Sequence, residues 1–248
     1  VDDVCQAYPK SMNSLLEHLD LSQDGLYRVK QAFDKGNLTR ACELLLDYYY
    51  KGETAQFLRK ELPEPFKGTP SEADSIVRNT FTFYTQTDKV SRGPEGHLDW
   101  THQGPAEDKE WAWALNRHHH FRVLLNAYQN TGNPKYAKTL NRHIKDWVIS
   151  SLPYPGEKGN TAMWRGLEVS FRAKRWARVF YGLMDCDAFT SASRLLLLSS
   201  LPEHAHYLRH FHAARGNWLT MEMSGLAMIS AAGKFLCPIQ MLLGQDLS

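Results

Sequence analysis

The apolar residues of this 248-residue chain recur at intervals of three and four over most of its length, and this spacing limits what the chain can fold into. A helix with such spacing has one continuous apolar face, whereas a half-buried strand needs strict alternation. The segment NLTRACELLLDYYYKG is typical, because Asn37 is a good N-cap and Gly52 ends the pattern. No convincing run of alternating residues is found. The sequence therefore predicts an all-α fold.

The helical segments follow one another in pairs. KEWAWALNRHHHFRVLLNAYQNTGNPKYAKTLNRHIKDWVISSL predicts two antiparallel helices broken at Gly132, with Asn133 as the cap and Pro134 at the first helical position. Two more long helical patterns follow, and the second is expected to break or kink at Pro202. Helix pairs in series build either a solenoid or a closed α/α toroid. Because no strict repeat of about 34 residues is present, we prefer the toroid.

Length and composition narrow the class of protein. We expect one helical domain over residues 1–248, with a long irregular connection over 53–106 that is rich in Pro, Gly, Thr and charge. The balance of 29 basic and 27 acidic side chains argues against a nucleic-acid footprint. No apolar run approaches the ~20 residues of a membrane span. The four scattered cysteines indicate neither a zinc ribbon nor a disulfide framework.

A first candidate site lies on the helix predicted near residues 111–130. Trp113, Asn116 and His120 recur there at i, i+3 and i+7, which places them on one stripe. An indole face and fixed polar groups suit a sugar ring and its hydroxyls. The alternative is a partly buried face with satisfied polar groups, which the pattern alone favours.

A second stripe joins Trp164, Glu168 and Arg172. Glu168 and Arg172 stand in the favourable order for an ion pair within one helix, which is the structural interpretation. In the functional interpretation, Arg172 faces an anionic substrate, because a guanidinium pairs bidentately with sulfate or carboxylate.

The histidines raise the question of a metal site. His206 and His210 are spaced i, i+4, which can place two imidazoles on one ion. The sequence HAHYLRH lacks the Glu of HExxH and identifies no third ligand, so no metal site and no cofactor are expected. Serine-hydrolase, P-loop and dinucleotide-binding motifs are absent from the sequence.

Three ordered stretches carry a family resemblance. EWAWALNRHHHFRVLLNAYQNTGNPKYAKTLNRHIKDWV, WRGLEVSFRAKRW and RGNWLTMEMSGLAMISAAGKF resemble the heparinase II/III family, over about residues 10–235. The resemblance implies an incomplete N-terminal α/α toroid followed by a β domain. It also implies a bacterial periplasmic or secreted lyase that cleaves an acidic glycosaminoglycan, heparan sulfate, by β-elimination. We expect such a protein to be a monomer.

The resemblance gives one residue a chemical role. Asn217 matches the family asparagine that neutralises the uronate carboxylate, with Trp218 as a wall of the cleft. Without the family, Asn217 would equally be a helix cap. The family's proton acceptor, a tyrosine, and its acid, a histidine, would lie beyond residue 248, and the pattern departs from the family after Phe235. We therefore expect this polypeptide to bind substrate without turnover.

Two other functions remain open at this stage. Helical toroids also host glycoside hydrolases, which need two carboxylates, and Glu168 with Glu222 is the pair the sequence offers. A helical-repeat interaction scaffold would need no catalytic residues. A local basic cluster that includes Lys174 and Arg175 would allow binding of an acidic polysaccharide despite the near-neutral total charge.

Overall fold

A computed structural model describes residues 1–52, 55–59, 70–159 and 161–233, and most of these residues are helical. The departure from the family pattern after Phe235 lies outside the described residues. The elements in chain order are α1 (Asp2–Ala7), α2 (Pro9–Glu17), α3 (Tyr27–Asp34), α4 (Leu38–Lys51), α5 (Gln56–Arg59), α6 (Pro70–Val77), β1 (Thr80–Phe83), β2 (Gln86–Lys89), α7 (Lys109–Asn116), α8 (His119–Thr131), α9 (Pro134–Ser150), α10 (Gly166–Gly182), α11 (Ser191–His210) and α12 (Gly216–Gly233).

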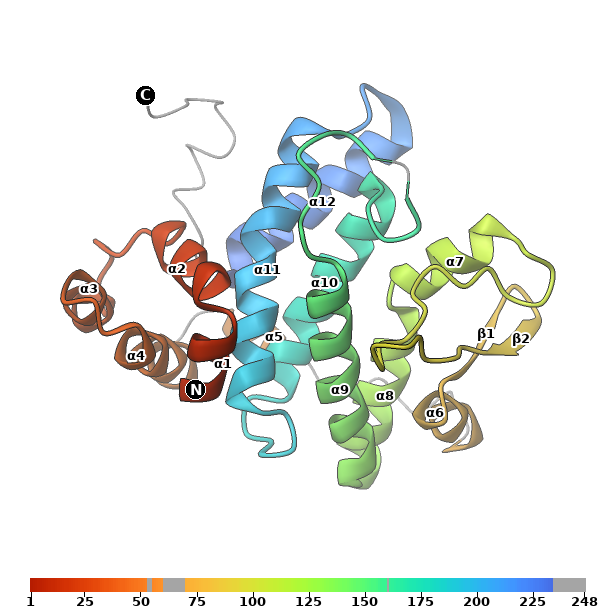
Figure 1. Cartoon of the computed structure of the whole chain (residues 1–248), viewed down its shortest axis with the longest axis horizontal. Coiled ribbons are helices and arrows are strands. Elements are labelled where there is room, and N and C mark those ends of the chain that lie inside the picture. The colour runs from red at the N-terminus through yellow and green to blue at the C-terminus, as the bar shows by residue number, and fades with distance from the viewer. Residues whose placement is uncertain (53–54, 60–69, 160, 234–248) are drawn as a thin grey trace.

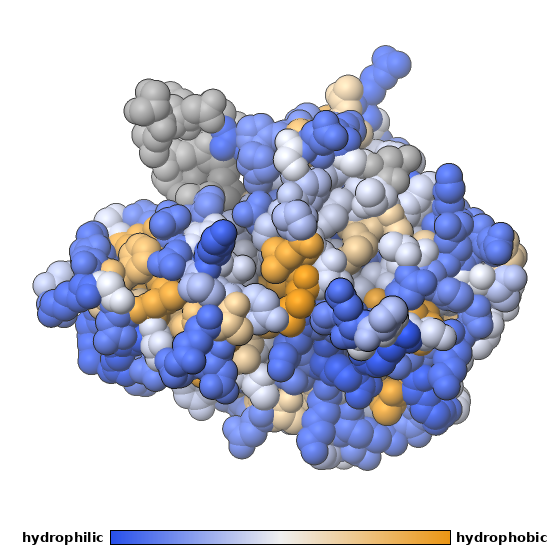
Figure 2. Space-filling view, in the orientation of Figure 1, coloured by the Kyte–Doolittle hydropathy of each residue, from blue (hydrophilic) through white to orange (hydrophobic). Residues whose placement is uncertain are grey.

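Long helices form the centre of the molecule. α11 packs against α9 and α10 there, and α8 also packs on α9 and α10 (Figure 1). The N-terminal helices α1–α4 lie on one side of this centre, and α6, the hairpin of β1 and β2, and α7 lie on the other. The surface in the same view is mostly hydrophilic, with a small hydrophobic patch near the middle (Figure 2). None of the described helices is long and apolar enough to cross a membrane.

Local capping signals in the sequence predicted helix starts correctly. The Asn37 side chain accepts a hydrogen bond from the backbone N–H of Arg40 at 3.0 Å and begins α4. The Asn133 side chain accepts one from the N–H of Lys135 at 3.1 Å, and Pro134 is the first residue of α9. In both cases the cap satisfies a backbone donor that has no partner within the helix.

Two predicted helix boundaries differ from the structure. α11 continues through Pro202, so the helix does not break there, and Leu201 and Pro202 are buried in the core. Conversely, the helix predicted over 111–130 is interrupted between α7 and α8, where His118 has a left-handed backbone with φ of 55°. The buried ring of His118 accepts a hydrogen bond from Trp176 Nε1 at 2.9 Å, so contacts with another helix accompany the interruption.

The segment predicted to be irregular, 53–106, contains ordered elements in its described part. They are α5, α6 and an antiparallel hairpin of β1 and β2. Buried Asp146 on α9 holds the chain that follows the hairpin. Its carboxylate accepts hydrogen bonds from the N–H of Leu98 at 2.8 Å and from Trp100 Nε1 at 3.2 Å, and it pairs with His97 Nδ1 at 2.8 Å. One carboxylate thus fixes this connection against the core.

α12 crosses α10 at very short range. A Cβ placed on Gly225 of α12 would lie 2.5 Å from Ser170 Oγ and 2.7 Å from Ser170 Cα. The Ser170 hydroxyl also donates a hydrogen bond to the carbonyl of Met221 at 2.5 Å. Only glycine permits this approach, because a backbone carbon cannot rotate away as a side chain does.

We expect Gly225→Ala to lower the free energy of unfolding by about 1–3 kcal/mol, because the added methyl group overpacks the crossing of the two helices. Urea denaturation followed by tryptophan fluorescence measures the change. Gly156→Ala is the matched control, since a Cβ at Gly156 meets nothing within 4 Å. Equal stability of the two variants would contradict the packing argument.

Candidate functional site

Two tryptophans and an arginine meet at the surface where α7, α10 and α12 come together. The guanidinium carbon of Arg165 lies 3.5 Å from the ring centroid of Trp113 and 5.4 Å from that of Trp218. Trp218 is 47% exposed, and Trp113 is partly exposed. Both distances are in the range of cation–π attraction. We call Trp113, Arg165 and Trp218 the aromatic clamp.

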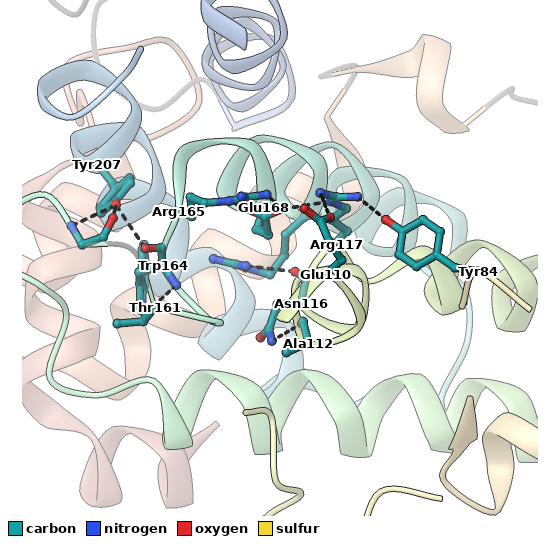
Figure 3. Close-up of polar contacts among 12 residues, drawn as sticks. Tyr84, Glu110, Ala112, Asn116, Arg117, Thr161, Trp164, Arg165, Glu168 and Tyr207 are labelled. Carbon is teal, nitrogen blue, oxygen red and sulfur yellow. Dashed lines mark hydrogen bonds and ion pairs between the residues drawn. The ribbon is translucent and has the colours of Figure 1, made fainter. Parts of the chain in front are cut away.

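A buried carboxylate holds the arginine of the clamp in place. Glu168 on the first turn of α10 accepts hydrogen bonds from Arg165 Nε at 2.5 Å and Arg165 Nη2 at 2.8 Å (Figure 3). Arg117 Nε donates to the same carboxylate at 2.9 Å, and Arg117 Nη1 donates to the Tyr84 hydroxyl at 2.9 Å. Arg117 Nη2 also lies 3.8 Å from Glu110 Oε2, so two guanidiniums meet two carboxylates, of which Glu168 is fully buried.

Asn217 is exposed beside the clamp, in the first turn of α12. It follows Gly216, the first residue of the helix, so Asn217 is inside the helix and is not its N-cap. The structure therefore does not support the interpretation of Asn217 as a cap. Among the described residues its side chain makes no hydrogen bond. Its amide is thus accessible at a helix N-terminus, where unpaired backbone N–H groups favour a negative charge.

The carboxylates proposed for a glycoside hydrolase are both buried and engaged. Glu168 is held by two arginines, as described above. Glu222 is 3% exposed, and its Oε2 accepts a hydrogen bond from the N–H of Ala213 at 2.6 Å. A Cβ on Gly166 would collide with Glu222, so the start of α10 lies directly against this side chain. Neither carboxylate is placed to reach a sugar, and the hydrolase alternative has no support here.

Asn116 was predicted to bind substrate, but it is fully buried. Its Nδ2 donates to the carbonyls of Trp100 at 2.7 Å and Ala112 at 2.9 Å, and its Oδ1 accepts from Trp147 Nε1 at 2.9 Å. Every hydrogen-bonding position of this amide is occupied within the core, apart from the second lone pair of its oxygen. Asn116 therefore positions the helices and has no free group for a sugar.

Arg172 was predicted to face an anionic substrate, and the structure places it in the interior instead. The alternative, an ion pair with Glu168, is not formed either. Arg172 Nε donates to His204 Nε2 at 2.9 Å, and Nη1 donates to the carbonyl of Asn116 at 3.0 Å. Its guanidinium carbon lies 3.9 Å from the ring centroid of Trp147. Burial lowers the pKa of Arg172 to about 9, partly offset by the charge of Glu168.

His120 and Trp164, also predicted to bind substrate, lie behind the surface at 3% and 5% exposure. The His120 ring stands edge-on to Phe81 at 4.9 Å between centroids. The backbone carbonyl of Trp164 accepts a hydrogen bond from the Tyr207 hydroxyl at 3.1 Å. Of the seven predicted site residues, the structure brings only Trp113, Asn217 and Trp218 to one exposed surface.

The pair of histidines on α11 does not complete a metal site. The His206 and His210 rings lie 4.3 Å apart between centroids. In the part of the chain that the structure describes, no group of three or more His, Cys, Asp or Glu side chains could hold a metal ion.

Sequence reasoning missed three residues of the site, Tyr84, Arg117 and Arg165. Arg165 is within the family-like stretch WRGLEVSFRAKRW, but a lone arginine before a helix carries no signal of a partner on another helix. Tyr84 is in the turn between β1 and β2, and the alternating stretch TFTFYTQTDK was the available signal for that hairpin.

Comparison with known proteins identifies relatives over most of the chain. The family model described as Heparinase II/III N-terminus matches residues 15–236. A heparin-sulfate lyase of Pedobacter heparinus is 28% identical over 209 residues, which are 81% of this chain and 31% of the relative. A heparin-sulfate lyase of Bacteroides stercoris is 27% identical over 222 residues, which are 82% of this chain and 33% of the relative. The chain thus spans about a third of the length of these relatives.

Solved structures share the fold. A heparan sulfate lyase from Pedobacter heparinus matches 90% of this chain and 36% of its own, with a TM-score of 0.73 and 24% identity. A heparinase III with methylated lysines matches 93% of this chain and 38% of its own, with a TM-score of 0.78 and 23% identity. These likenesses confirm the predicted all-α architecture as an incomplete α/α toroid.

Proposed function

Because the chain belongs to the heparinase II/III family, we propose that it is the substrate-binding helical domain of a lyase that cleaves heparan sulfate by β-elimination. The observation that carries this proposal is the position of Asn217, exposed at the N-terminus of α12 beside the aromatic clamp. A uronic acid bound there would meet an amide donor, a helix N-terminus and a guanidinium at once.

Asn217 supplies what the elimination needs first. The C5 proton of a uronate is only weakly acidic, because its removal adds charge next to a carboxylate. A donor aimed at that carboxylate stabilises the enolate as it forms, and this lowers the barrier. An amide donates without releasing a proton of its own, and the partial positive charge at the start of α12 acts in the same direction.

The aromatic clamp supports binding of the sugar chain. The exposed indole of Trp218 can stack on the apolar face of a pyranose ring, and the Trp113 ring packs on the guanidinium of Arg165. The guanidinium of Arg165 is oriented by its two bonds to Glu168 and does not have to lose rotamer freedom on binding. Preorganisation of this kind favours recognition of an acidic saccharide.

We assign neither the proton acceptor nor the acid to residues near Asn217 in sequence. The Tyr207 hydroxyl is buried, has the carbonyls of Gly159 and Trp164 as alternative acceptors for its one proton, and accepts from the N–H of Gly159. Burial also raises its pKa, which opposes formation of a phenolate base. We therefore propose that both groups come from outside residues 1–248.

This proposal predicts that the 248-residue polypeptide binds heparan sulfate and forms no unsaturated uronide. A calorimetric titration measures binding, and ultraviolet absorbance of the unsaturated product on the same sample measures cleavage. Product formation would overturn the placement of the base and acid, and absence of binding would overturn the substrate assignment. Absence of binding would favour the alternative of a helical interaction scaffold, which should bind protein and should not bind anionic saccharide.

A matched pair of variants ties the binding to the site. We expect Trp218→Ala to weaken binding about 10-fold, because a stacked, exposed indole contributes on the order of 1–2 kcal/mol. Tyr27→Ala is the control, since Tyr27 is an aromatic on α3 that is more exposed than Trp218, at 71%. A similar loss in both variants would place the saccharide elsewhere.

We further propose that the protein acts outside the cytoplasm, in the periplasm or after secretion, and as a monomer. Both statements rest on what the family implies. Cell fractionation and light scattering of the purified protein test them.

A further inference from the structure

A basic pocket lies between α8 and α10. It has a volume of about 470 Å³, and its lining includes Arg122, Lys174, Arg175 and Arg178. None of the described residues that line it is acidic. Lys174 and Arg175 therefore present two cationic groups of α10 to this hollow.

Neutral donors and an aromatic ring complete the lining. Asn126 and Gln129 contribute amides from α8, and Phe171 contributes a ring from α10. The ring of Phe171 lies 5.0 Å from Lys174 Nζ and 5.2 Å from the guanidinium carbon of Arg175. It packs beneath these cations and restricts where they can move.

His119 adds a donor of defined tautomer. Arg175 Nη2 donates to His119 Nδ1 at 2.6 Å, and a guanidinium has no lone pair to offer in return. Nδ1 is therefore the unprotonated nitrogen, and Nε2 carries the hydrogen. Burial and the nearby arginines lower the pKa of His119 to about 3, so the ring stays neutral at physiological pH.

The cations of the pocket repel one another. Burial, followed by the charges of Arg122 and Arg178, lowers the pKa of Arg175 to about 10. Burial and two neighbouring arginines also lower the pKa of Lys174. Arg175 Nε is buried and has no hydrogen-bond partner. An anion in the pocket would relieve the repulsion and supply an acceptor for this group.

The pocket is connected to the candidate site through Phe171. The guanidinium carbon of Arg117, which binds Glu168 below the clamp, lies 5.8 Å from the Phe171 ring on which Lys174 and Arg175 also pack. Cationic groups thus continue from the clamp along α10 into the pocket.

From these contacts we infer that the pocket between α8 and α10 is a second binding site, which takes a sulfate group of the same polysaccharide chain that the aromatic clamp holds. The inference rests on the proposed function and deepens it, because it assigns recognition of sulfation to residues apart from Asn217 and the clamp. A tetrahedral oxyanion suits the set of one lysine, several guanidiniums and two amides.

The test compares two polymers and three variants. Calorimetric titration measures the affinity of the protein for heparan sulfate and for the unsulfated backbone polysaccharide. The variants are Lys174→Gln, Arg175→Gln and, as a matched control, Lys138→Gln, whose lysine is exposed on α9 away from the pocket. Thermal unfolding of each variant checks that it folds. Lys174→Gln is the decisive variant if Arg175→Gln does not fold, because Lys174 is only partly buried and its hydrogen bond to Ser224 is at the surface.

We expect Lys174→Gln and Arg175→Gln each to weaken heparan sulfate binding about 10-fold, the loss of one charge-assisted hydrogen bond. Affinity for the unsulfated chain should stay within about 2-fold, and Lys138→Gln should match the wild type. Inorganic sulfate, added as the only competitor, should reduce heparan sulfate binding to the wild-type protein and should not reduce binding to Lys174→Gln.

Two results would overturn the inference. Unchanged heparan sulfate affinity in both pocket variants would mean that the pocket takes no part in binding. An equal loss of affinity for the unsulfated polysaccharide would mean that the pocket attracts negative charge in general and does not recognise sulfate groups. Neither result affects the proposed function, which is tested separately by heparan sulfate binding to the wild type, by product formation, and by comparing Trp218→Ala with Tyr27→Ala.

Discussion

Acidification from pH 8 to pH 5 is expected to lower the free energy of unfolding by about 8 kcal/mol. His118, His120, His143 and His204 are each 3% exposed or less, and burial is the first cause that lowers the pKa of all four. For His143 the lowered pKa is about 3. In the unfolded chain each of these rings titrates near pH 6.5. Between these values the unfolded state binds more protons, so stability falls as pH falls, by about 2 kcal/mol for each ring at pH 5.

Urea unfolding at several pH values measures this dependence. Stability should be full above about pH 6.5 and decline below it, with each buried ring contributing up to about 1.4 kcal/mol per pH unit. Neither ring nitrogen of His120 has a hydrogen-bond partner, so His120→Leu loses no hydrogen bond. This variant should reduce the dependence of the unfolding free energy on pH by the contribution of one buried ring. A constant midpoint from pH 8 to pH 5 would show that these rings are already solvated in the folded protein.

Replacement of the asparagine that corresponds to Asn217 by alanine, in a full-length family member, is expected to lower kcat about 100- to 1,000-fold. Loss of one preorganised donor to a developing oxyanion has this magnitude. KM should change by no more than about 3-fold, because the donor acts more strongly on the enolate than on the ground-state carboxylate. Steady-state kinetics with ultraviolet detection of the unsaturated product measures both constants.

The same substitution in the 248-residue polypeptide supplies the control. Asn217→Ala should leave its affinity for heparan sulfate within about 3-fold of the wild type. Asn217→Asp keeps the shape of the side chain but removes the donor and adds a negative charge, so it should weaken binding as well as turnover. If Asn217→Ala instead reduced affinity and left kcat intact in the relative, Asn217 would be a residue that positions the substrate.

Helix starts were predictable because the signals that determine them are local. Asn37 and Pro134 act within one turn of the chain, and each begins a helix where the sequence predicted it. The interruption between α7 and α8 depends on a distant partner, since His118 bonds to Trp176 on α10. The hairpin was missed because two four-residue strands give too short an alternation to stand out in a polar segment.

The candidate site was predictable only in its exposed part. Periodicity indicates which residues share a helix face but not which face points inward when a helix is buried on several sides. α10 is such a helix, and its Arg172 therefore faces the core where a surface position was expected. Asn217 was found through the family resemblance, since an exposed amide has no pattern of its own. Arg117 joins the site through Glu168, which lies 51 residues further along the chain, a contact that spacing does not reveal.

α12 contacts α10 closely at Gly225, and Asn217 lies at the N-terminal end of the same helix. A change in the tilt of α12 at this crossing therefore displaces Asn217. Eight residues separate the two positions, a distance of about 12 Å along the helix axis. If a methyl group at Gly225 tilted α12 by about 10°, the amide would move by about 2 Å. Misplacement by about 1 Å already costs an enzyme on the order of 100-fold in rate. A substitution at buried Gly225, two helical turns from Asn217, would thus lower the measured reaction rate as a substitution of Asn217 does.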